Sequence, residues 1–486
     1  MGNKFRNMLL VGIGIVVGAA ATVQFSASAQ KQTAPLPLEE LRQLADVFGL
    51  IKTDYVEPVE DKKLLTEAIS GMVSSLDPHS AYLDKKALQE LKEGTQGRFG
   101  GLGIEVGMED GYIKVISPIE DTPAYRAGIK PGDLITKLDG VSVKGKSLDE
   151  AVKIMRGDPN TQITLTIARK NVIKPIVMTL TREEIQVKSV KSKIVEPGYA
   201  WLRVAQFQEP TVEDLVNHIN RIYAQNPNLK GVVLDLRNDP GGLLPGAIGV
   251  ASIFLPKDAL VVSTNGQLPE SQAAFYARPE YYAGRTINDP LAKLPPQIKN
   301  VPMVVLVNIG SASASEIVAG ALQDHQRATI LGTQTFGKGS VQTIRQISPD
   351  TAVKLTTARY YTPSGRSIQA KGIIPDLIVD ETPEGDGLNS LRAREADLSK
   401  HLSNDDGEAT PNSERLNTAD EVKLLESAKK YKPIEYGTKK DFQLMQAINH
   451  LKGLPVKLSK THSEVKKTEV KATEKKPSNG RNEEKR

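Results

Sequence analysis

The chain has 486 residues, of which 39% are hydrophobic, and this is enough for two or three globular units. Lys and Arg outnumber Asp and Glu by 63 to 58, which gives a net charge of +5. The segment 457–486 accounts for this charge alone, with ten basic and five acidic residues, so the neutral remainder gives no support for nucleic-acid binding. The sequence has no cysteine, which excludes disulfides, metal–thiolate sites and a cysteine nucleophile.

The amino-terminal segment has the three parts of an export signal. Two cations precede an apolar run at 8–23, and Ala27-Ser-Ala29 follows as a cleavage sequence. The run is shorter than the about 20 apolar residues that a membrane-spanning helix needs. We therefore expect residues 1–29 to be a cleaved signal peptide, with an uncleaved inner-membrane anchor as the alternative. In both cases the protein would be exported, and it would be periplasmic or anchored facing the periplasm.

Two regions outside the central part show helical periodicity. In 30–95 the apolar residues recur at helical spacing, for example Leu38, Leu41, Ala45 and Phe48, then Leu64, Leu65, Ile69, Met72 and Val73. A second helical pattern lies within 419–455. Between the core and this pattern, 384–418 is rich in Gly, Asp, Asn and Ser, which indicates a linker. The tail at 456–486 has almost no large apolar residue, and we expect it to be disordered.

A glycine-rich module occupies residues 96–170. Its opening loop, Gly100-Gly-Leu-Gly-Ile104, offers backbone N–H groups that could bind the terminal carboxylate of a peptide, beside an edge strand that could pair with it. A helix follows, begun by the capping box Ser147-Leu-Asp-Glu150. Its apolar face would form a pocket wall or an ordinary core. The arginine at its end could reach a peptide carboxylate or the neighbouring protease core, or it could be only a cation that the helix dipole favours at this position. The predicted peptide-binding residues are Gly101, Leu102, Gly103, Ile104, Leu148, Val152 and Arg156.

Ser313 lies where a predicted strand turns into a helix. Residues 301–309 are largely apolar and β-branched, the pattern of a strand buried on both faces, and a helical pattern runs over 316–323. A hydroxyl at this turn would be exposed at a helix N-terminus, where backbone N–H groups favour a developing anion. Ser313-Ala-Ser-Glu316 is also a capping box, however. Residue chemistry alone does not choose among Ser311, Ser313 and Ser315 as a nucleophile.

Lys338 follows Ser313 by 25 residues, between two glycines. A lysine can act as the base of a serine nucleophile if its amine is neutral. Near neutral pH this requires a pKa lowered by roughly three units, or about 4 kcal/mol, and burial is the usual cause. The surrounding sequence is apolar, without a carboxylate between Asp324 and Asp350. If the segment is extended, Gln342 shares a face with Lys338 and could hold the amine. A solvated loop charge is the alternative.

A second turn follows another buried strand, predicted over 231–237. The strand leads into Asn238-Asp-Pro-Gly-Gly242, where two glycines leave the backbone able to approach a substrate closely. The N–H groups of Gly241, Gly242 and Ala314 could form an oxyanion hole. A plain Pro-Gly turn is the alternative.

These motifs resemble those of the C-terminal processing, or tail-specific, serine proteases. The resemblance covers roughly Leu76 to Leu454, and the matching blocks are 236–242, 310–316, 320–324, 335–339, 360–366 and 372–376. It implies a Ser-Lys peptidase in which Ser313 is the nucleophile, Lys338 the general base and Gln342 the residue that orients the lysine. The module at 96–170 resembles a PDZ domain, which implies recognition of the C-terminus of a substrate or activator.

The implied fold is a multidomain α+β one. A PDZ domain, a small β-barrel with helices, would precede a mixed α/β core at 171–383 that resembles the ClpP/crotonase-like fold, with helical segments at both ends. We expect a serine endopeptidase that cleaves exported or partly unfolded proteins near their C-termini, without a metal or organic cofactor. In relatives the N-terminal helices build dimers, so we expect a homo-oligomer, and an activator or adaptor protein is a further partner to consider.

Two other functions stay open from the sequence. One is a PDZ scaffold or adaptor with a catalytically silent core, and the intact Ser313, Lys338 and Gln342 argue against it. The other is a non-proteolytic hydrolase or acyl-transfer enzyme on the same core, which the PDZ module argues against.

Overall fold

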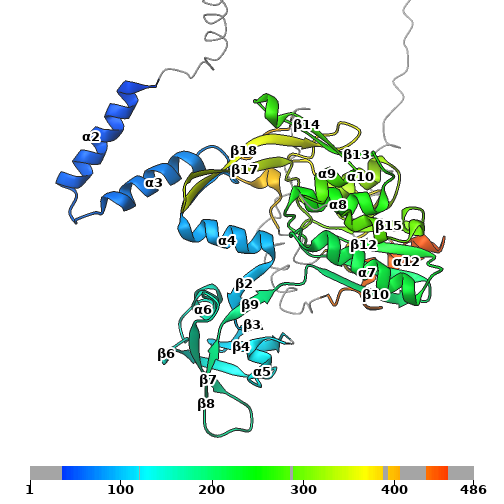
Figure 1. Ribbon diagram of the computed structural model, residues 1–486, viewed down its shortest axis with the longest axis horizontal. Coiled ribbons are helices and arrows are strands. Elements are labelled where there is room, and N and C mark those ends of the chain that lie inside the picture. Colours follow the sequence, from blue (N-terminus) through cyan, green and yellow to red (C-terminus); the bar gives the residue numbers. More distant parts are fainter. Residues whose placement is uncertain (1–35, 120, 285–287, 387–391, 405–433, 458–486) are drawn as a thin grey trace, which may run out of the picture. The chain divides into compact units, whose positions relative to one another are not determined.

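The computed structural model describes residues 36–119, 121–284, 288–386, 392–404 and 434–457 (Figure 1). The predicted signal segment and nearly all of the predicted basic tail lie outside the described residues. The chain divides into two compact units, Met1–Ile69 and Ser70–Arg486.

The first unit contains helix α2 (Leu38–Asp54) and the beginning of α3 (Asp61–Ser74). Two glutamates in the first turn of α2 and a lysine in its last turn suit the helix dipole. Helix α2 buries none of its residues, and its exposed apolar side chains include Leu38, Leu41, Leu44, Val47 and Leu50. None of the helices in the described part of the chain is long and apolar enough to cross a membrane.

The predicted PDZ module is an antiparallel sheet with the strand order β3-β4-β5-β7-β8 and β6 paired to β5. Helix α6 (Leu148–Met155) begins with the predicted capping box, in which Ser147 and Glu150 each accept a hydrogen bond from the other's backbone N–H. The remaining elements are β3 (Ile104–Glu109), β4 (Tyr112–Pro118), α5 (Pro123–Arg126), β5 (Leu134–Leu138), β6 (Val141–Ser142), β7 (Gln162–Ala168) and β8 (Ile176–Thr181).

This module continues past residue 170, where the sequence placed its end. Strand β8 pairs with β7 from Ile176 to Thr181, and Leu180 is buried in the core of the module. The predicted boundary was therefore too early. Only one residue of β8 is fully buried, so the strand leaves a weak alternation in the sequence. Beyond it, β9 (Glu183–Gln186) pairs with β2 (Arg98–Gly101).

A six-stranded sheet with the order β10-β11-β12-β15-β16-β19 forms the centre of the core. Strand β10 is antiparallel to β11, and all the other neighbours are parallel. Strands β12 and β15 are buried along their whole length, as their apolar sequences predicted. The bounds are β10 (Val190–Glu196), β11 (Tyr199–Val204), β12 (Gly231–Asp235), β15 (Met303–Val307), β16 (Thr329–Gly332) and β19 (Leu377–Ile378).

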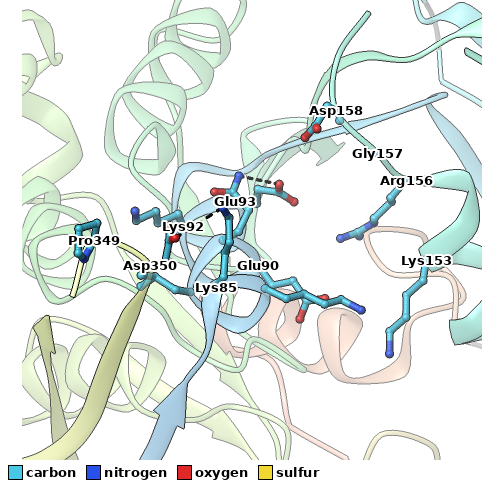
Figure 2. A pocket seen from close by; sticks show the side chains of 14 residues that line it. Lys85, Glu90, Lys92, Glu93, Lys153, Arg156, Gly157, Asp158, Pro349 and Asp350 are labelled. Carbon is cyan, nitrogen blue, oxygen red and sulfur yellow. Dashed lines mark hydrogen bonds and ion pairs between the residues drawn. The ribbon is translucent and has the colours of Figure 1, made fainter. Parts of the chain in front are cut away.

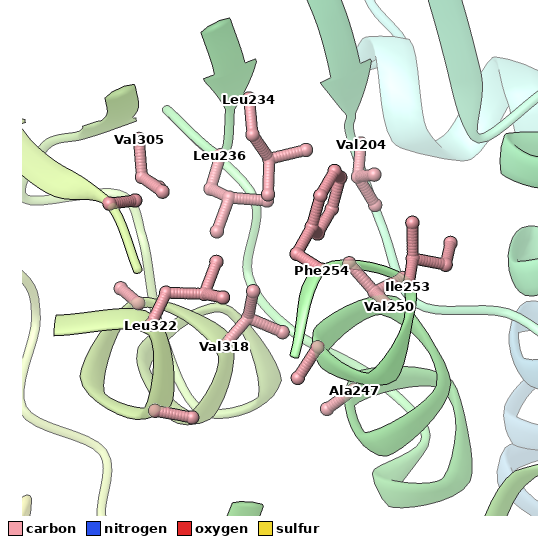
Figure 3. Close-up of a cluster of buried hydrophobic side chains, with 14 of the residues drawn as sticks. Val204, Leu234, Leu236, Ala247, Val250, Ile253, Phe254, Val305, Val318 and Leu322 are labelled. Atoms are coloured by element: carbon pink, nitrogen blue, oxygen red, sulfur yellow. The ribbon is translucent and has the colours of Figure 1, made fainter. Parts of the chain in front are cut away.

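Helices cover both faces of this sheet. Helices α7 (Thr211–Gln225), α8 (Leu244–Phe254) and α10 (Ala314–Asp324) pack on one face, where Leu234 and Val305 meet Val250, Phe254 and Val318 (Figure 3). Helix α12 (Phe442–Leu451) packs on the other face against a separate apolar cluster. Successive strand residues alternate between the two clusters, because side chains point to opposite faces of a strand.

A second sheet has the order β1-β18-β13-β14, and β17 pairs with the other edge of β18. Its elements are β1 (Ala81–Leu83), β13 (Leu260–Asn265), β14 (Ala273–Tyr276), β17 (Ser340–Ser348) and β18 (Thr351–Tyr361), and helix α4 (Lys85–Gln96) follows β1. Short helices complete the fold: η1 (Pro269–Ser271), α9 (Pro279–Tyr282), η2 (Pro290–Lys293), η3 (Pro296–Lys299) and η5 (Glu395–Asp397).

The C-terminal segment is held to the core by a buried ion pair. Arg237 is fully buried, and its guanidinium donates to both Asp235 and Asp441. Breaking such a pair from one side typically costs about 3–5 kcal/mol, because it leaves an uncompensated buried charge. The ring of Tyr436 lies 4.5 Å from the Arg237 guanidinium. Since Arg237 is the second residue after β12, this contact fixes the start of the loop that leaves that strand.

The segment predicted as a linker, 384–418, is only partly described, and its described part is packed. Glu395 is fully buried, Arg394 donates to the Thr335 carbonyl, and Asn404 donates to the Gln369 carbonyl. These residues are packed, so the linker interpretation was wrong for them. Polar contacts rather than an apolar stripe hold them, and such contacts leave no periodic pattern in the sequence. The predicted helices within 419–455 are described only from residue 434 onward, where α12 is found.

Candidate active site

Three loops meet at the carboxyl edge of the parallel sheet. Strands β12, β15 and β16 are neighbours, and each is followed by one of the three candidate catalytic motifs that the sequence singled out. Parallel strands end at the same edge, so the loops converge there. Ala312 donates its N–H to the Asp239 carbonyl at 3.0 Å, and Phe336 donates to the Ser311 carbonyl at 3.0 Å. The three motifs therefore form one site.

Ser313 immediately precedes α10 and has a strained backbone. Its φ of 55° and ψ of −112° lie in a region that residues other than glycine rarely adopt. Such strain costs about 1–3 kcal/mol and is concentrated at functional sites. Gly241 lies so close that a Cβ on it would be 2.8 Å from the Ser313 Cβ and 3.0 Å from the Ala314 nitrogen. The loop after β12 thus packs directly on the serine.

The structure distinguishes the three serines that the sequence left equivalent. Ser311 and Ser315 are fully buried, and their hydroxyls donate to the carbonyls of Leu236 and Asp239, both at 2.8 Å. These two hydroxyls join the nucleophile segment to the loop after β12. Ser313 is only partly buried, so it is the serine of the three whose side chain solvent can reach.

Glu316 connects the serine segment with the lysine loop. Its Oε2 accepts from the backbone N–H groups of Ser313 at 2.7 Å and Lys338 at 2.9 Å. Its Oε1 accepts from the Thr335 hydroxyl at 2.5 Å and the Gly337 N–H at 2.7 Å. The backbones of Ser313 and Lys338 are therefore both within hydrogen-bond distance of a single oxygen atom.

The sequence identified Glu316 only as part of a capping box. Burial raises the pKa of Glu316 to about 7, although the hydrogen bonds from Thr335, Gly337, Ser313 and Lys338 oppose the rise. Ionised Glu316 is acceptor-only and can serve all four donors at once. The contact with Lys338 could not be read from the sequence, because no local spacing links a helix residue to a loop beyond the next strand.

Burial lowers the pKa of Lys338, and the nearby charge of Lys354 lowers it further. Three carboxylates, Glu395, Glu316 and Asp77, act in the opposite direction and raise it. None of these three carboxylates belongs to the segment between Asp324 and Asp350, which has no acidic residue. The three acidic groups come from distant segments, and tertiary packing brings them to the lysine. The net direction is nevertheless toward a neutral amine, as a general base requires.

The two predicted oxyanion glycines face different neighbours. Gly241 packs against Ser313 and Ala314, but its N–H donates to the Asp239 Oδ1 at 2.9 Å. Gly242 faces Phe207 instead, since a Cβ on it would be 2.0 Å from the Phe207 carbonyl oxygen. Gly241 and Ala314 are thus the pair that lies beside the serine, and the assignment of an oxyanion hole to these residues stays a prediction.

Gln342 lies in β17, whereas Lys338 lies in the loop before that strand. The shared strand face assumed from the sequence is therefore absent. The Gln342 Nε2 instead donates to the hydroxyls of Ser340 at 3.0 Å and Thr356 at 3.3 Å. These contacts involve the amide nitrogen and leave the role of the amide oxygen to be assigned.

The PDZ module has a groove of about 100 Å³ beside its opening loop. Six of the predicted peptide-binding residues line it: Gly101, Leu102, Gly103, Ile104, Val152 and Arg156. Leu148, the first residue of α6, is not among its lining residues, and its part in peptide binding stays a prediction. Phe99, Val106 and Met155 line the groove as well. The Arg156 guanidinium lies over the Phe99 ring, 4.3 Å from its centroid.

Arg156 also borders a larger pocket of about 610 Å³ that is strongly charged (Figure 2). Figure 2 shows Lys153 and Arg156 opposite Lys85 and Glu90 of α4. Asp350, between β17 and β18, lines the same pocket. Cations and carboxylates are intermixed along it, so it has no single charge preference. Ser313, Lys338 and Gln342 are not among its lining residues.

Within the described ranges, no group of three or more His, Asp and Glu side chains could hold a metal ion. The prediction that no cofactor is needed stays a prediction.

Comparisons with known proteins identify the family of this chain. Residues 198–379 match peptidase family S41, residues 114–169 match the PDZ domain, and residues 13–87 match the N-terminal domain of the activating protease CtpB. The chain is 48% identical over 367 residues to a carboxy-terminal-processing protease of Bartonella bacilliformis, covering 75% of this chain and 81% of that protein. It is 40% identical over 353 residues to a probable CtpA-like serine protease of Staphylococcus aureus, covering 72% and 67%.

Solved structures include related proteins. The photosystem II D1 C-terminal processing protease is 30% identical, with a TM-score of 0.40, and the match covers 70% of this chain and 86% of that one. The PDZ domain of a carboxy-terminal protease of Vibrio cholerae, in complex with a peptide, is 26% identical, with a TM-score of 0.18, over 18% of this chain and 99% of that one.

The chain belongs to peptidase family S41, the C-terminal processing peptidases. It is a serine-type peptidase in which a PDZ domain precedes a mixed α/β protease core. The recognised family, the fold class and the enzyme class predicted from the sequence are confirmed.

Proposed function

We propose that Ser313 and Lys338 form a Ser-Lys catalytic dyad and that Gln342 orients the lysine. The observation that carries this proposal is the shared Glu316 oxygen, which accepts from the backbone N–H groups of both Ser313 and Lys338. The lowered pKa of Lys338, caused mainly by its burial, supports its role as the base. The commitment of the Ser311 and Ser315 hydroxyls to backbone carbonyls supports the choice of Ser313.

The chemistry then follows from these groups. The neutral Lys338 amine accepts the Ser313 proton while the serine oxygen attacks the scissile carbonyl carbon. The N–H of Ala314, the residue after the nucleophile, stabilises the tetrahedral oxyanion. The Lys338 ammonium donates its proton to the leaving amine, and an acyl-enzyme remains. Water, deprotonated by Lys338, attacks this ester, and the proton returns to the Ser313 oxygen as the new carboxyl product leaves.

The substrates would be exported or partly unfolded proteins cleaved near their C-termini, in the periplasm or at its inner membrane. The groove lined by Gly101, Leu102 and Gly103 suits a peptide C-terminus, because a glycine-rich loop can present N–H groups to a carboxylate. The exposed apolar side chains of α2 fit the prediction that the N-terminal helices associate in a homo-oligomer.

The test is cleavage of an unfolded, exported-type protein by the purified full chain and by Ser313→Ala. We expect no cleavage by Ser313→Ala, with an unchanged melting temperature. Ser311→Ala and Ser315→Ala are the matched controls. They remove buried hydrogen bonds, so they should lower stability but keep activity in the folded protein. Full activity of Ser313→Ala would disprove the dyad and would leave a different nucleophile, whereas no cleavage by the unchanged chain would leave a catalytically silent scaffold.

A further inference from the structure

The Gln342 amide is one end of a chain of hydrogen bonds that runs through Thr356 to Asp77, a residue outside the predicted protease core. A side-chain amide has a donor end and an acceptor end, and only the oxygen can accept a hydrogen bond from a lysine amine. The Gln342 Nε2 donates to Ser340 and Thr356 hydroxyl oxygens. If these contacts fix the nitrogen end of the amide, the oxygen end faces away from them. They then also determine whether Gln342 can accept a hydrogen bond from the Lys338 amine.

A β-bulge places Thr356 opposite Gln342. Along the β17–β18 pair, Val341 lies opposite Ala358, but the next residue, Gln342, lies opposite Thr356, so Thr357 is the extra residue of β18. Bulges of this kind redirect a side chain and are common beside active sites. Thr357 instead pairs its hydroxyl with that of Thr343 at 2.7 Å. The two adjacent threonines therefore have different partners, and Thr356 is the one bonded to Gln342.

The hydroxyl of Thr356 can serve as an acceptor for Gln342 because its proton is used elsewhere. The Thr356 Oγ1 donates to the Asp77 Oδ1 at 3.1 Å. Burial alone would raise the pKa of Asp77, but hydrogen bonds from the Ser80 hydroxyl, from the N–H groups of His79 and Ser80 and from Thr356 bring it below its ordinary value. Asp77 is therefore ionised at neutral pH and can only accept.

Asp77 is itself held in place. Its Oδ1 also accepts from the N–H groups of His79 at 2.8 Å and Ser80 at 2.9 Å, and its Oδ2 accepts from the Ser80 hydroxyl at 2.7 Å. Strand β1, which follows at once, pairs with β18 from Ala81 opposite Lys354. The Asp77 carboxylate is thus held by hydrogen bonds within its own turn, and the pairing of β1 with β18 places this turn beside the edge of β18.

We propose that Asp77, acting through Thr356, is a positioning group that fixes the Gln342 amide with its oxygen free to accept a hydrogen bond from the Lys338 amine. This inference rests on the proposed roles of Lys338 and Gln342. It assigns a part in catalysis to the short segment 77–80, which lies between the N-terminal helices and the PDZ module. Neither Asp77 nor Thr356 touches the substrate in this assignment.

The Asp77 charge has a second effect on the same lysine. The charged groups that act on Lys338 are Lys354, which lowers its pKa, and Glu395, Glu316 and Asp77, which raise it. Removal of the Asp77 charge should therefore lower the pKa of Lys338. Because the neutral amine is the active form, the rising limb of activity against pH should move to lower pH. A residue that only supported the fold would not shift this limb.

The decisive experiment is a double-mutant cycle on kcat with the full chain. Thr356→Val removes the hydroxyl and keeps the shape, and Gln342→Ala removes the amide. We expect Thr356→Val to lower kcat by about five- to tenfold with little change in KM, as for the loss of one hydrogen bond. In the Gln342→Ala background the same change should have almost no effect. Thr357→Val, the matched control, should keep the kcat of the unchanged protein.

Three outcomes would overturn the inference: no loss with Thr356→Val, equal losses with and without Gln342, or an equal loss with Thr357→Val. The pH profile of Asp77→Asn is a further test. Its kcat should be lower, and the rising limb of its activity against pH should lie at lower pH than in the unchanged protein. An unmoved rising limb would argue against the assignment. Failure here is distinct from failure of the proposed function. If Ser313→Ala is inactive but the cycle is additive, the dyad stands and only the positioning chain is rejected.

Discussion

The peptide groove of the PDZ module and the protease site are assembled in different ways. The groove uses two short stretches, 99–106 and 152–156, which a single small module brings together. The charged groups that act on Lys338 range from Asp77 to Glu395, and they lie at the edges of two sheets and in the packed segment 392–404. The groove is therefore formed within one small module, whereas the protease site brings together segments that are distant in the sequence.

The difference extends to burial. Glu316 is fully buried in the protease site, whereas Arg156 at the groove is exposed. Removing one partner of a buried charged group leaves the others unsatisfied, and an exposed contact is replaced by water at little cost. We therefore expect substitutions in the protease site to have much larger effects on activity than substitutions in the groove.

The largest effect is expected for the base. Lys338→Arg should lower kcat by about 10⁴-fold, as much as Lys338→Ala, because an arginine cannot be deprotonated in a protein and so cannot accept the serine proton. The measurement is peptide cleavage with the folded state checked by circular dichroism. Appreciable turnover by Lys338→Arg would reject the general-base role and would weaken the contrast between the two regions.

A smaller but still large effect is expected for Glu316→Gln, about 10²-fold in kcat. A glutamine has one acceptor oxygen, so its NH₂ group would face two of the four donors that the carboxylate now accepts. In the unchanged enzyme, ionisation of Glu316 near pH 7 should add to the rise of activity that deprotonation of Lys338 causes, because the carboxylate then accepts all four hydrogen bonds. Glu150→Gln, at the exposed capping box of α6, is the matched control and should leave kcat unchanged. Equal activity of the two variants would mean that Glu316 does not align the site.

The smallest effect is expected at the groove. Peptides with a free apolar C-terminus should be cleaved a few-fold faster than their amidated copies, which lack the carboxylate that the glycine loop would bind. Arg156→Ala should reduce this difference if Arg156 transmits occupancy of the groove, which requires that the ligand bind two states of the enzyme differently. Equal rates for both peptides in the unchanged enzyme would remove the C-terminus-sensing role, and a preserved difference in Arg156→Ala would remove only the transmission.

Much of this architecture could be predicted from local patterns. The buried strands at 231–237 and 301–309, the helix after Ser313 and the capping box of α6 all correspond to elements of the structure, because apolar periodicity and caps act over a few residues. The end of the PDZ module was placed too early, since β8 buries only one residue fully. The described part of the predicted linker proved to be packed, since its contacts are polar and scattered.

The sequence by itself determined the class of the protein and the segments that carry the candidate catalytic residues, because these are properties of short motifs and their order. The tertiary structure decided how the residues act together. It distinguished Ser313 from its two neighbours by burying their hydroxyls, and it joined Glu316 to the Lys338 loop. It also brought three carboxylates to a lysine whose own segment has none. The physical reason is that burial and electrostatic fields depend on distance in space, and sequence separation does not determine that distance.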